Sequence, residues 1–153
     1  ILDNTAIQGT AITMSSPTWA NVQDLIASLE ANNSEGGGFV IHPLAAATLR
    51  TTLKESGDAG AGYLMESGSR IDEYPAMKST LIPVTSGSPD NSPLIFGNWS
   101  DLLIGFWSEL DILVNPYEST AYAKGNVQLR ALMTCDVAIR HTQSFNYGSA
   151  LPH

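Results

Sequence analysis

The most regular hydrophobic pattern in the chain lies between Val127 and Arg140. Every second residue from Val127 to Ile139 is apolar. Such period-two alternation predicts a β-strand with one buried face. At 3.3 Å per residue the strand would span roughly 46 Å, whereas a compact chain of this length has a diameter of about 38 Å. The pattern therefore predicts one strand that is longer than the body of the protein.

The first third of the chain carries apolar residues at helical spacing. Residues 19–29 form one such stripe, and Ser16 and Pro17 are expected to supply its N-cap and its first helical residue. Residues 39–43, "FVIHP", predict a short buried strand that ends at Pro43. This stretch therefore predicts a helix followed by a strand.

A second predicted helix begins at Pro43 and runs to Ser56, with an apolar stripe that includes Leu53. Gly57 is expected to end it. The glycine-rich stretch Gly57 to Gly68 predicts a mobile surface loop, because few apolar residues anchor it.

From Tyr74 onward, short apolar runs alternate with turn residues. Strands are predicted within 74–84, 94–96, 102–107 and 111–114, before the long strand. Helices come first and strands last, which favours an α+β fold over an alternating α/β sheet.

Composition narrows the classes of function. The chain has 153 residues and a formal net charge of −8, and its basic residues form no run. One domain, or one domain with an extension, is expected, and direct binding of nucleic acid through a basic patch is disfavoured.

Cys135 is the only cysteine, which excludes an internal disulfide. No membrane-spanning stretch or signal peptide is predicted, and the start at Ile1 suggests a fragment or a processed product.

The candidates for catalysis have simpler structural explanations. His42, at a strand end, is interpreted as a capping or core histidine rather than a base. His141 and His153 have no second ligand at a metal-like spacing, so no metal or cofactor is predicted. The acidic pairs Asp72/Glu73 and Glu109/Asp111 are interpreted as solvated residues rather than glycosidase carboxylates. "GDAGAG" follows a helix and lacks the Lys-Ser/Thr of a phosphate loop.

Two further groups of residues point to packing or assembly. Trp99, Phe106 and Trp107 form an aromatic cluster that is interpreted as core, with a subunit interface as the alternative. Asp136 and Arg140 share one face of the predicted long strand but lie about 13 Å apart. Each of these two charges must therefore find its partner elsewhere.

Four stretches, in order and at similar spacing, resemble the C-terminal half of the Hong Kong 97 type major capsid protein of tailed bacteriophages. They are "FVIHPLAAATLRTTLKESGDAGAGYLM", "EYPAMKSTLIP", "LIFGNWSDLLIGFWSELDILVNPY" and "VQLRALMTCDVAIRHTQSF", and the opening "ILDNTAIQGT" is similar to a segment that follows a glycine-rich turn in that family.

The resemblance implies a non-enzymatic shell subunit that forms pentamers and hexamers of an icosahedral phage or prophage head. Its fold would be a mixed sheet flanked by helices, with an elongated peripheral sheet that holds the long strand. Residues 17–117 would form the apical region, and residues 1–16 and 118–153 the peripheral region. The family's N-terminal arm, extended loop and spine helix have no counterpart in these residues. An isopeptide cross-link is not predicted, because no lysine-bearing loop is present.

The implied partner is a second copy of the protein, without specific nucleic-acid binding, a membrane or a small-molecule substrate. The implied location is the virion capsid, with assembly in the bacterial cytoplasm. An encapsulin-like compartment shell is the nearest alternative, and a small hydrolase that uses His42 with Asp72 or Glu73 is another. The candidate assembly residues are Trp99, Asp101, Trp107, Asp136, Arg140, Gly60, Gly62 and Tyr63.

Overall fold

The computed structural model describes residues 12–117 and 119–153, which form two compact units. Unit 1 comprises the chain up to Asp101 together with His141–His153, and unit 2 comprises Leu102–Arg140. The similarity drawn for residues 1–10 falls outside the described residues. The predicted apical and peripheral regions are places in a shell, and they stay a prediction.

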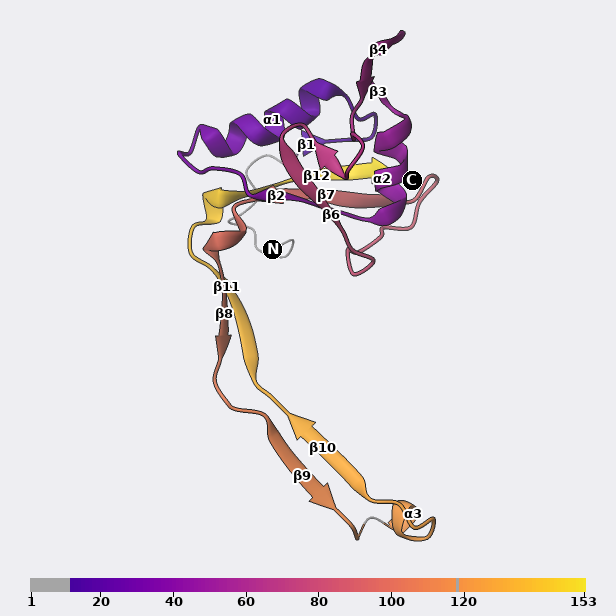
Figure 1. Cartoon of the computed structure of the whole chain (residues 1–153), viewed down its shortest axis with the longest axis vertical. Helices are drawn as coiled ribbons and strands as arrows, with labels where there is room; N and C mark the ends of the chain where they lie inside the picture. The colour runs from indigo at the N-terminus through magenta and orange to yellow at the C-terminus, as the bar shows by residue number, and fades with distance from the viewer. Residues whose placement is uncertain (1–11, 118) are drawn as a thin grey trace. The chain divides into compact units, whose positions relative to one another are not determined.

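Unit 1 is built on a six-stranded mixed sheet (Figure 1). The strand order is β1-β12-β7-β2-β6-β5, with β2 parallel to β6 and antiparallel to β7. Helix α1 contacts β1, β7 and β12, and helix α2 contacts β12 and β4. The elements of unit 1 are β1 (Ile12–Thr13), α1 (Trp19–Glu30), β2 (Gly38–Ile41), α2 (Pro43–Thr51), β3 (Leu53–Glu55), β4 (Asp58–Tyr63), β5 (Arg70–Ile71), β6 (Tyr74–Lys78), β7 (Asn91–Gly97), the 3-10 helices η1 (Trp99–Asp101) and η2 (Thr142–Ser144), and β12 (Phe145–Pro152).

Helix α1 confirms the predicted apolar stripe but begins two residues later than expected. Thr18, rather than Ser16, is the N-cap: its side chain accepts a hydrogen bond from the Asn21 N–H, and the Asn21 side chain accepts one from the Thr18 N–H. This reciprocal capping box satisfies two amides that the helix leaves free. The helix buries Val22, Leu25, Ile26 and Leu29 against the sheet.

Helix α2 is shorter than predicted. Pro43 occupies its first turn, and His42 caps it by accepting the Leu44 N–H on Nδ1 at 3.3 Å. The helix ends at Thr51, because Thr52 is extended and Leu53 pairs with Tyr63 in a β-ladder. The extension of the helix to Ser56 was therefore wrong: two β-branched threonines weaken the helix where strand pairing competes.

A β-hairpin replaces much of the predicted loop at Gly57 to Gly68. Strands β3 and β4 pair around the two-residue connection Ser56-Gly57, where Gly57 has a φ of 88°. A left-handed glycine suits such tight hairpin turns. Leu64 and Met65, which follow β4, are buried in the core. The expectation that few apolar residues anchor this stretch was wrong for its second half, where these two side chains are buried.

The core of unit 1 contains stacked aromatic rings between β2, β6 and β7. Phe39 and Phe96 stack with centroids 4.3 Å apart, and Tyr74 meets Phe96 edge-on at 5.0 Å. A Cβ atom at Gly36 would lie 2.0 Å from Phe96 Cζ, so only glycine fits beside this ring. Rings in these arrangements add to the free energy that burial alone provides.

Unit 2 is a two-stranded antiparallel ribbon, with β8 beside β11 and β9 beside β10 (Figure 1). The predicted single strand from Val127 to Arg140 is interrupted, because Met133 and Thr134 separate β10 from β11. Its apolar face was predicted to be buried, and the structure contradicts this too: Leu129, Met133 and Val137 are all exposed. The elements are β8 (Leu102–Phe106), β9 (Asp111–Asn115), α3 (Ser119–Tyr122), β10 (Gln128–Leu132) and β11 (Cys135–Ile139).

Candidate functional site: the apolar ribbon

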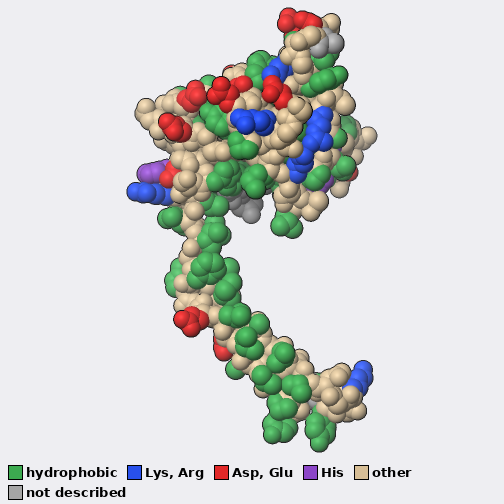
Figure 2. Space-filling model, viewed as in Figure 1, with side chains coloured by type: hydrophobic (Ala, Val, Ile, Leu, Met, Phe, Trp, Pro, Cys, Tyr) green, Lys and Arg blue, Asp and Glu red, His purple; other side chains and the backbone are tan. Residues whose placement is uncertain are grey.

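The ribbon of unit 2 exposes large apolar side chains along both strands. Fifteen of the twenty exposed large hydrophobic residues of the described chain lie between Leu102 and Arg140, about a quarter of its length. Figure 2 shows hydrophobic side chains along much of the visible side of this ribbon. Two strands alone cannot bury both of their faces. Contiguous apolar surface of this kind marks a site of interaction.

The register of β8 and β11 gives this half of the ribbon two different faces. On one face Phe106 pairs with Cys135 and Ile104 with Val137, and all four side chains are apolar. On the other face Gly105 pairs with Asp136 and Leu103 with Ala138. We call these the apolar face and the mixed face of the β8–β11 ladder.

The ladder of β9 and β10 repeats this division. Ile112 pairs with Ala131 and Val114 with Leu129 on an apolar face. On the opposite face, Leu113 faces Arg130 and Asp111 faces Leu132. Ile112, Val114 and Leu129 are each more than half exposed. Both ladders therefore present apolar side chains for which the ribbon itself provides no cover.

A register shift joins the two ladders and explains the broken strand. Phe106 pairs with Cys135 and Asp111 with Leu132, so four residues on one strand face two on the other. The Trp107 N–H donates to the Thr134 carbonyl at 3.1 Å, and the Thr134 N–H donates to Ser108 Oγ at 3.0 Å. Two extra residues preserve the inward and outward alternation, whereas one would reverse it.

The aromatic cluster predicted as core divides between the two units. Trp99 packs edge-on against Phe145 at 5.4 Å and donates from Nε1 to the Gly38 carbonyl at 3.0 Å. Phe106 and Trp107 are 63% and 67% exposed, so the core assignment was wrong for both. Period-two alternation reports that a face is apolar, and it does not report whether this chain covers that face.

The remaining assembly candidates lie in separate places, and their proposed role stays a prediction. Asp101 accepts a hydrogen bond from Ser144 Oγ at 2.6 Å within unit 1. Gly60, Gly62 and Tyr63 belong to strand β4 of the hairpin. Asp136 and Arg140 lie in unit 2.

The residues considered for hydrolysis do not converge on an active site. The Nδ1 atom of His42 is engaged in the α2 cap, and its ring stacks on His153 with centroids 5.2 Å apart. Asp72 accepts a hydrogen bond from Gln23 Nε2 at 3.0 Å. No cluster of three or more metal-binding side chains occurs within residues 12–117 and 119–153.

Tyr74 is the residue of unit 1 with a clear electrostatic perturbation. Burial raises the pKa of its hydroxyl, and the nearby carboxylates of Glu30, Glu73, Asp72 and Glu35 raise this pKa further. Both causes disfavour the charged tyrosinate. The hydroxyl therefore stays protonated and is a poor candidate for a base at neutral pH.

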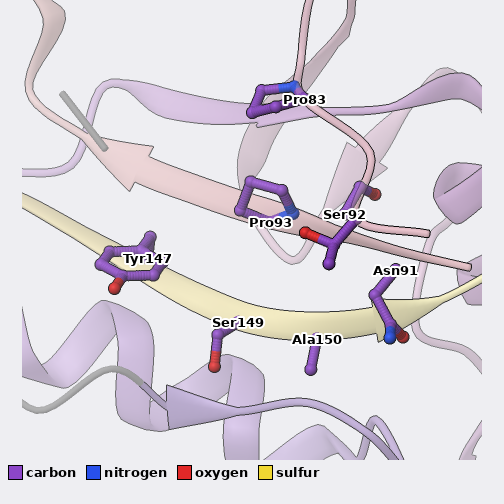
Figure 3. A pocket seen from close by; sticks show the side chains of 8 residues that line it. Pro83, Asn91, Ser92, Pro93, Tyr147, Ser149 and Ala150 are labelled. Carbon is purple, nitrogen blue, oxygen red and sulfur yellow. The ribbon is translucent and has the colours of Figure 1, made fainter. Parts of the chain in front are cut away.

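A pocket of about 280 Å³ lies beside a bulge between β7 and β12 (Figure 3). The bulge faces Pro93, which has no N–H for the ladder, and Ala150 within it has a φ of 58°. The Ser92 hydroxyl is buried and has no hydrogen-bond partner among the described residues. The lining residues carry no charge, so the pocket offers no acid or base for catalysis: they are Pro83, Thr85, Asn91, Ser92, Pro93, Tyr147, Ser149 and Ala150.

A sequence model of the phage capsid family matches residues 1–150. The chain belongs to the phage capsid family. A comparison with curated proteins gives no match. Among the helices that the structure describes, none has the length and apolar character that a membrane crossing requires.

Several solved structures have a similar fold. The chain matches a protein of the capsid of an empty GTA particle with a TM-score of 0.62 and 19% identity, covering 84% of this chain and 43% of that one. It matches the holo-SrpI encapsulin complex of Synechococcus elongatus with a TM-score of 0.62 and 14% identity, covering 95% and 54%. A Gordonia phage Cozz chain gives a TM-score of 0.56 and 18% identity, covering 92% and 52%.

The TM-scores establish the fold, which is the Hong Kong 97 type capsid fold. The α+β prediction and the family resemblance are therefore confirmed. The chain spans about half the length of the solved chains that it matches.

Proposed function

We propose that this chain is part of a major capsid protein, a structural subunit that forms pentamers and hexamers of an icosahedral shell around phage DNA. The exposed apolar ribbon carries the proposal. A shell subunit must bury broad contact surfaces when it assembles, and apolar side chains supply most of the driving force. Membership of the phage capsid family and the likeness to chains from capsids support this role.

The proposed place of the protein is the virion capsid, after assembly in the host cytoplasm. Its partner is a second copy of itself. The formal net charge of −8 supports a shell that encloses DNA without binding it directly, because binding of phosphate groups requires a basic surface. The structural role replaces the hydrolase hypothesis, because the Nδ1 of His42 caps α2.

The test is assembly of the intact protein, followed by electron microscopy and sedimentation. The wild type should form closed shells. A double variant, Val114→Lys with Leu129→Lys, places two charges at one paired position of the ribbon. It should stay unassembled, while its circular dichroism spectrum stays that of the folded wild type. Thr80→Lys, on an exposed residue of unit 1, is the matched control and should assemble.

Shells formed equally well by the double lysine variant would contradict the role of the ribbon. A wild type that stays unassembled under all assembly conditions would contradict the shell function itself.

An encapsulin-like compartment shell is the second candidate. The encapsulin match favours it, since 95% of this chain aligns with a TM-score of 0.62. The contents of purified shells separate the two proposals. DNA inside them supports the phage head, whereas a packaged enzyme without DNA supports the compartment.

A further inference from the structure

The register shift between the two ladders divides the ribbon into two separate sheets. The ladder of β8 and β11 ends at the pair of Phe106 and Cys135, and the ladder of β9 and β10 begins at the pair of Asp111 and Leu132. Between these pairs, four residues on one strand lie opposite two on the other, so they cannot pair one to one. We call these six residues the joint: 107–110 and 133–134.

Among the described residues, two hydrogen bonds cross the joint. The Trp107 N–H donates to the Thr134 carbonyl, and the Thr134 N–H donates to Ser108 Oγ. In an unbroken antiparallel ladder, a hydrogen-bonded pair exchanges two bonds between backbone groups. Here a serine hydroxyl replaces the second backbone acceptor. This side chain is exposed and can turn about its own bonds, so it holds the strands less firmly than a backbone carbonyl would.

The joint has little packing to hold its angle. All six of its residues are exposed, including Trp107 at 67% and Leu110 at 57%. Exposed hydrogen bonds and few buried contacts are the features of segments that open at low cost in free energy. Extra residues in one strand also bend a ribbon locally, and the ribbon changes direction at the joint (Figure 1).

The joint bends the ribbon without turning it over. Two extra residues on one strand keep the alternation of side chains, so Ile104 in β8 and Ile112 in β9 stay on the same apolar face. A single extra residue would have moved one of them to the opposite face. A change of angle at the joint therefore moves the apolar side chains of β9 and β10 as one group.

We propose that the joint is a hinge, at which the ladder of β9 and β10 changes its angle to the ladder of β8 and β11. The use of this hinge rests on the proposed shell function. Pentamers and hexamers place neighbouring copies at different angles, and each copy must still bury the same apolar face. A hinge of a few residues absorbs such a difference while the paired strands on either side keep their structure.

Pulsed electron spin resonance of the 153-residue chain tests the hinge. In a Cys135→Ser background, Leu103→Cys in β8 and Leu113→Cys in β9 place one spin label on each side of the joint. Both positions are half exposed, so the labels displace no buried side chain. The distribution of distances between the two labels should be broad, because frozen samples trap every angle that the hinge adopts.

A two-residue deletion supplies the matched control. Removal of Ser108 and Glu109 lets Trp107 pair with Thr134 and brings both ladders into one register. With the same pair of labels, the distance distribution should be about half as wide as in the undeleted chain, because a continuous ladder restores the backbone bonds that the joint lacks. Equal widths would overturn the hinge.

Single substitutions test the joint without a deletion. Ser108→Ala removes the acceptor of the Thr134 N–H, so the distance distribution should widen and the exchange of this amide hydrogen should become severalfold faster. Glu109→Ala, at the neighbouring exposed residue, is the matched control and should change neither quantity. If Ser108→Ala also leaves both unchanged, the serine does not hold the joint and this part of the proposal is overturned.

Assembly of the intact protein tests the use of the hinge. The wild type should form closed shells with both pentamers and hexamers in electron micrographs, whereas the deletion variant should form one kind of ring or no closed shell. Deletion-variant shells that contain both rings would overturn the use of the hinge and leave the shell function intact. A wild type that forms no shells would overturn the shell function, and the spin-label distances would still decide whether the joint bends.

Discussion

Unit 1 and the ribbon use similar apolar residues in strands but treat them in opposite ways. In β7 of unit 1, Leu94 and Phe96 are fully buried between neighbouring strands and α1. In β8 of the ribbon, Ile104 and Phe106 are 57% and 63% exposed. A six-stranded sheet with a helix across it supplies its own cover, and two strands do not. The comparison shows that unit 1 buries its own apolar side chains, whereas the ribbon leaves its apolar side chains exposed.

The largest expected effect contrasts two phenylalanines. Phe96→Ala removes a buried ring stacked on Phe39, so it should lower the free energy of unfolding of the 153-residue chain by about 3–5 kcal/mol. Phe106→Ala should change it by less than about 0.5 kcal/mol, because its ring is already in water. Urea denaturation followed by circular dichroism measures both. Similar losses in the two variants would show that the ribbon is packed after all.

Two glycines sharpen the same contrast. A Cβ atom at Gly97 in β7 would lie 2.2 Å from Phe145 Cδ1, so Gly97→Ala should cost about 1–3 kcal/mol of stability. At Gly105 in β8 the nearest atom is the far end of the Trp107 ring at 3.3 Å, which can move aside. Gly105→Ala should therefore be nearly neutral. Thermal unfolding of both variants checks this, and a larger loss at Gly105 would count against the account.

The N-cap of α1 provides a smaller, local test of unit 1. Thr18→Ala removes the side chain that accepts the Asn21 N–H, so it should lower stability by about 1 kcal/mol. Thr18→Ser keeps an accepting hydroxyl and should retain most of the stability. If serine proves as damaging as alanine, the cap is not the cause. Neither change should affect the rate at which a maleimide labels Cys135 in the ribbon.

The smallest expected effect concerns pH and Tyr74. Its pKa is raised in the folded chain, so the unfolded state loses this proton first as the pH rises past the ordinary value of 10.0. Stability is fully present below that pH and is lost as the pH rises through the folded pKa. Tyr74→Phe should show a weaker loss between pH 9 and about 11. Identical pH profiles of denaturation for wild type and variant would contradict the shift.

Much of unit 1 could be predicted from local patterns. The stripe that α1 buries and the strand around Phe39 follow from periodicity, since the sheet and the helix cover each other. The β3–β4 hairpin was missed because Leu53 continued the helical stripe while Ser56-Gly57 resembled a helix end. Distant strand pairing with Tyr63 decides that region, and no local pattern reports it.

The ribbon could be predicted in its alternation but not in its context. The break at Met133 and Thr134 depends on two extra residues in the opposite strand, which only the pairing of the two strands reveals. The exposure of Phe106 and Trp107 has no signal in the sequence, because it depends on what else is present to cover them.

The central claim is that the ribbon's apolar surface becomes buried in an assembled shell, and Cys135 measures this most directly. It is the only cysteine of these 153 residues, it is exposed, and it lies opposite Phe106 on the apolar face. Its rate of labelling with a water-soluble maleimide should be fast in the 153-residue chain and strongly suppressed in shells of the intact protein. Labelling that is equally fast in both would contradict the claim.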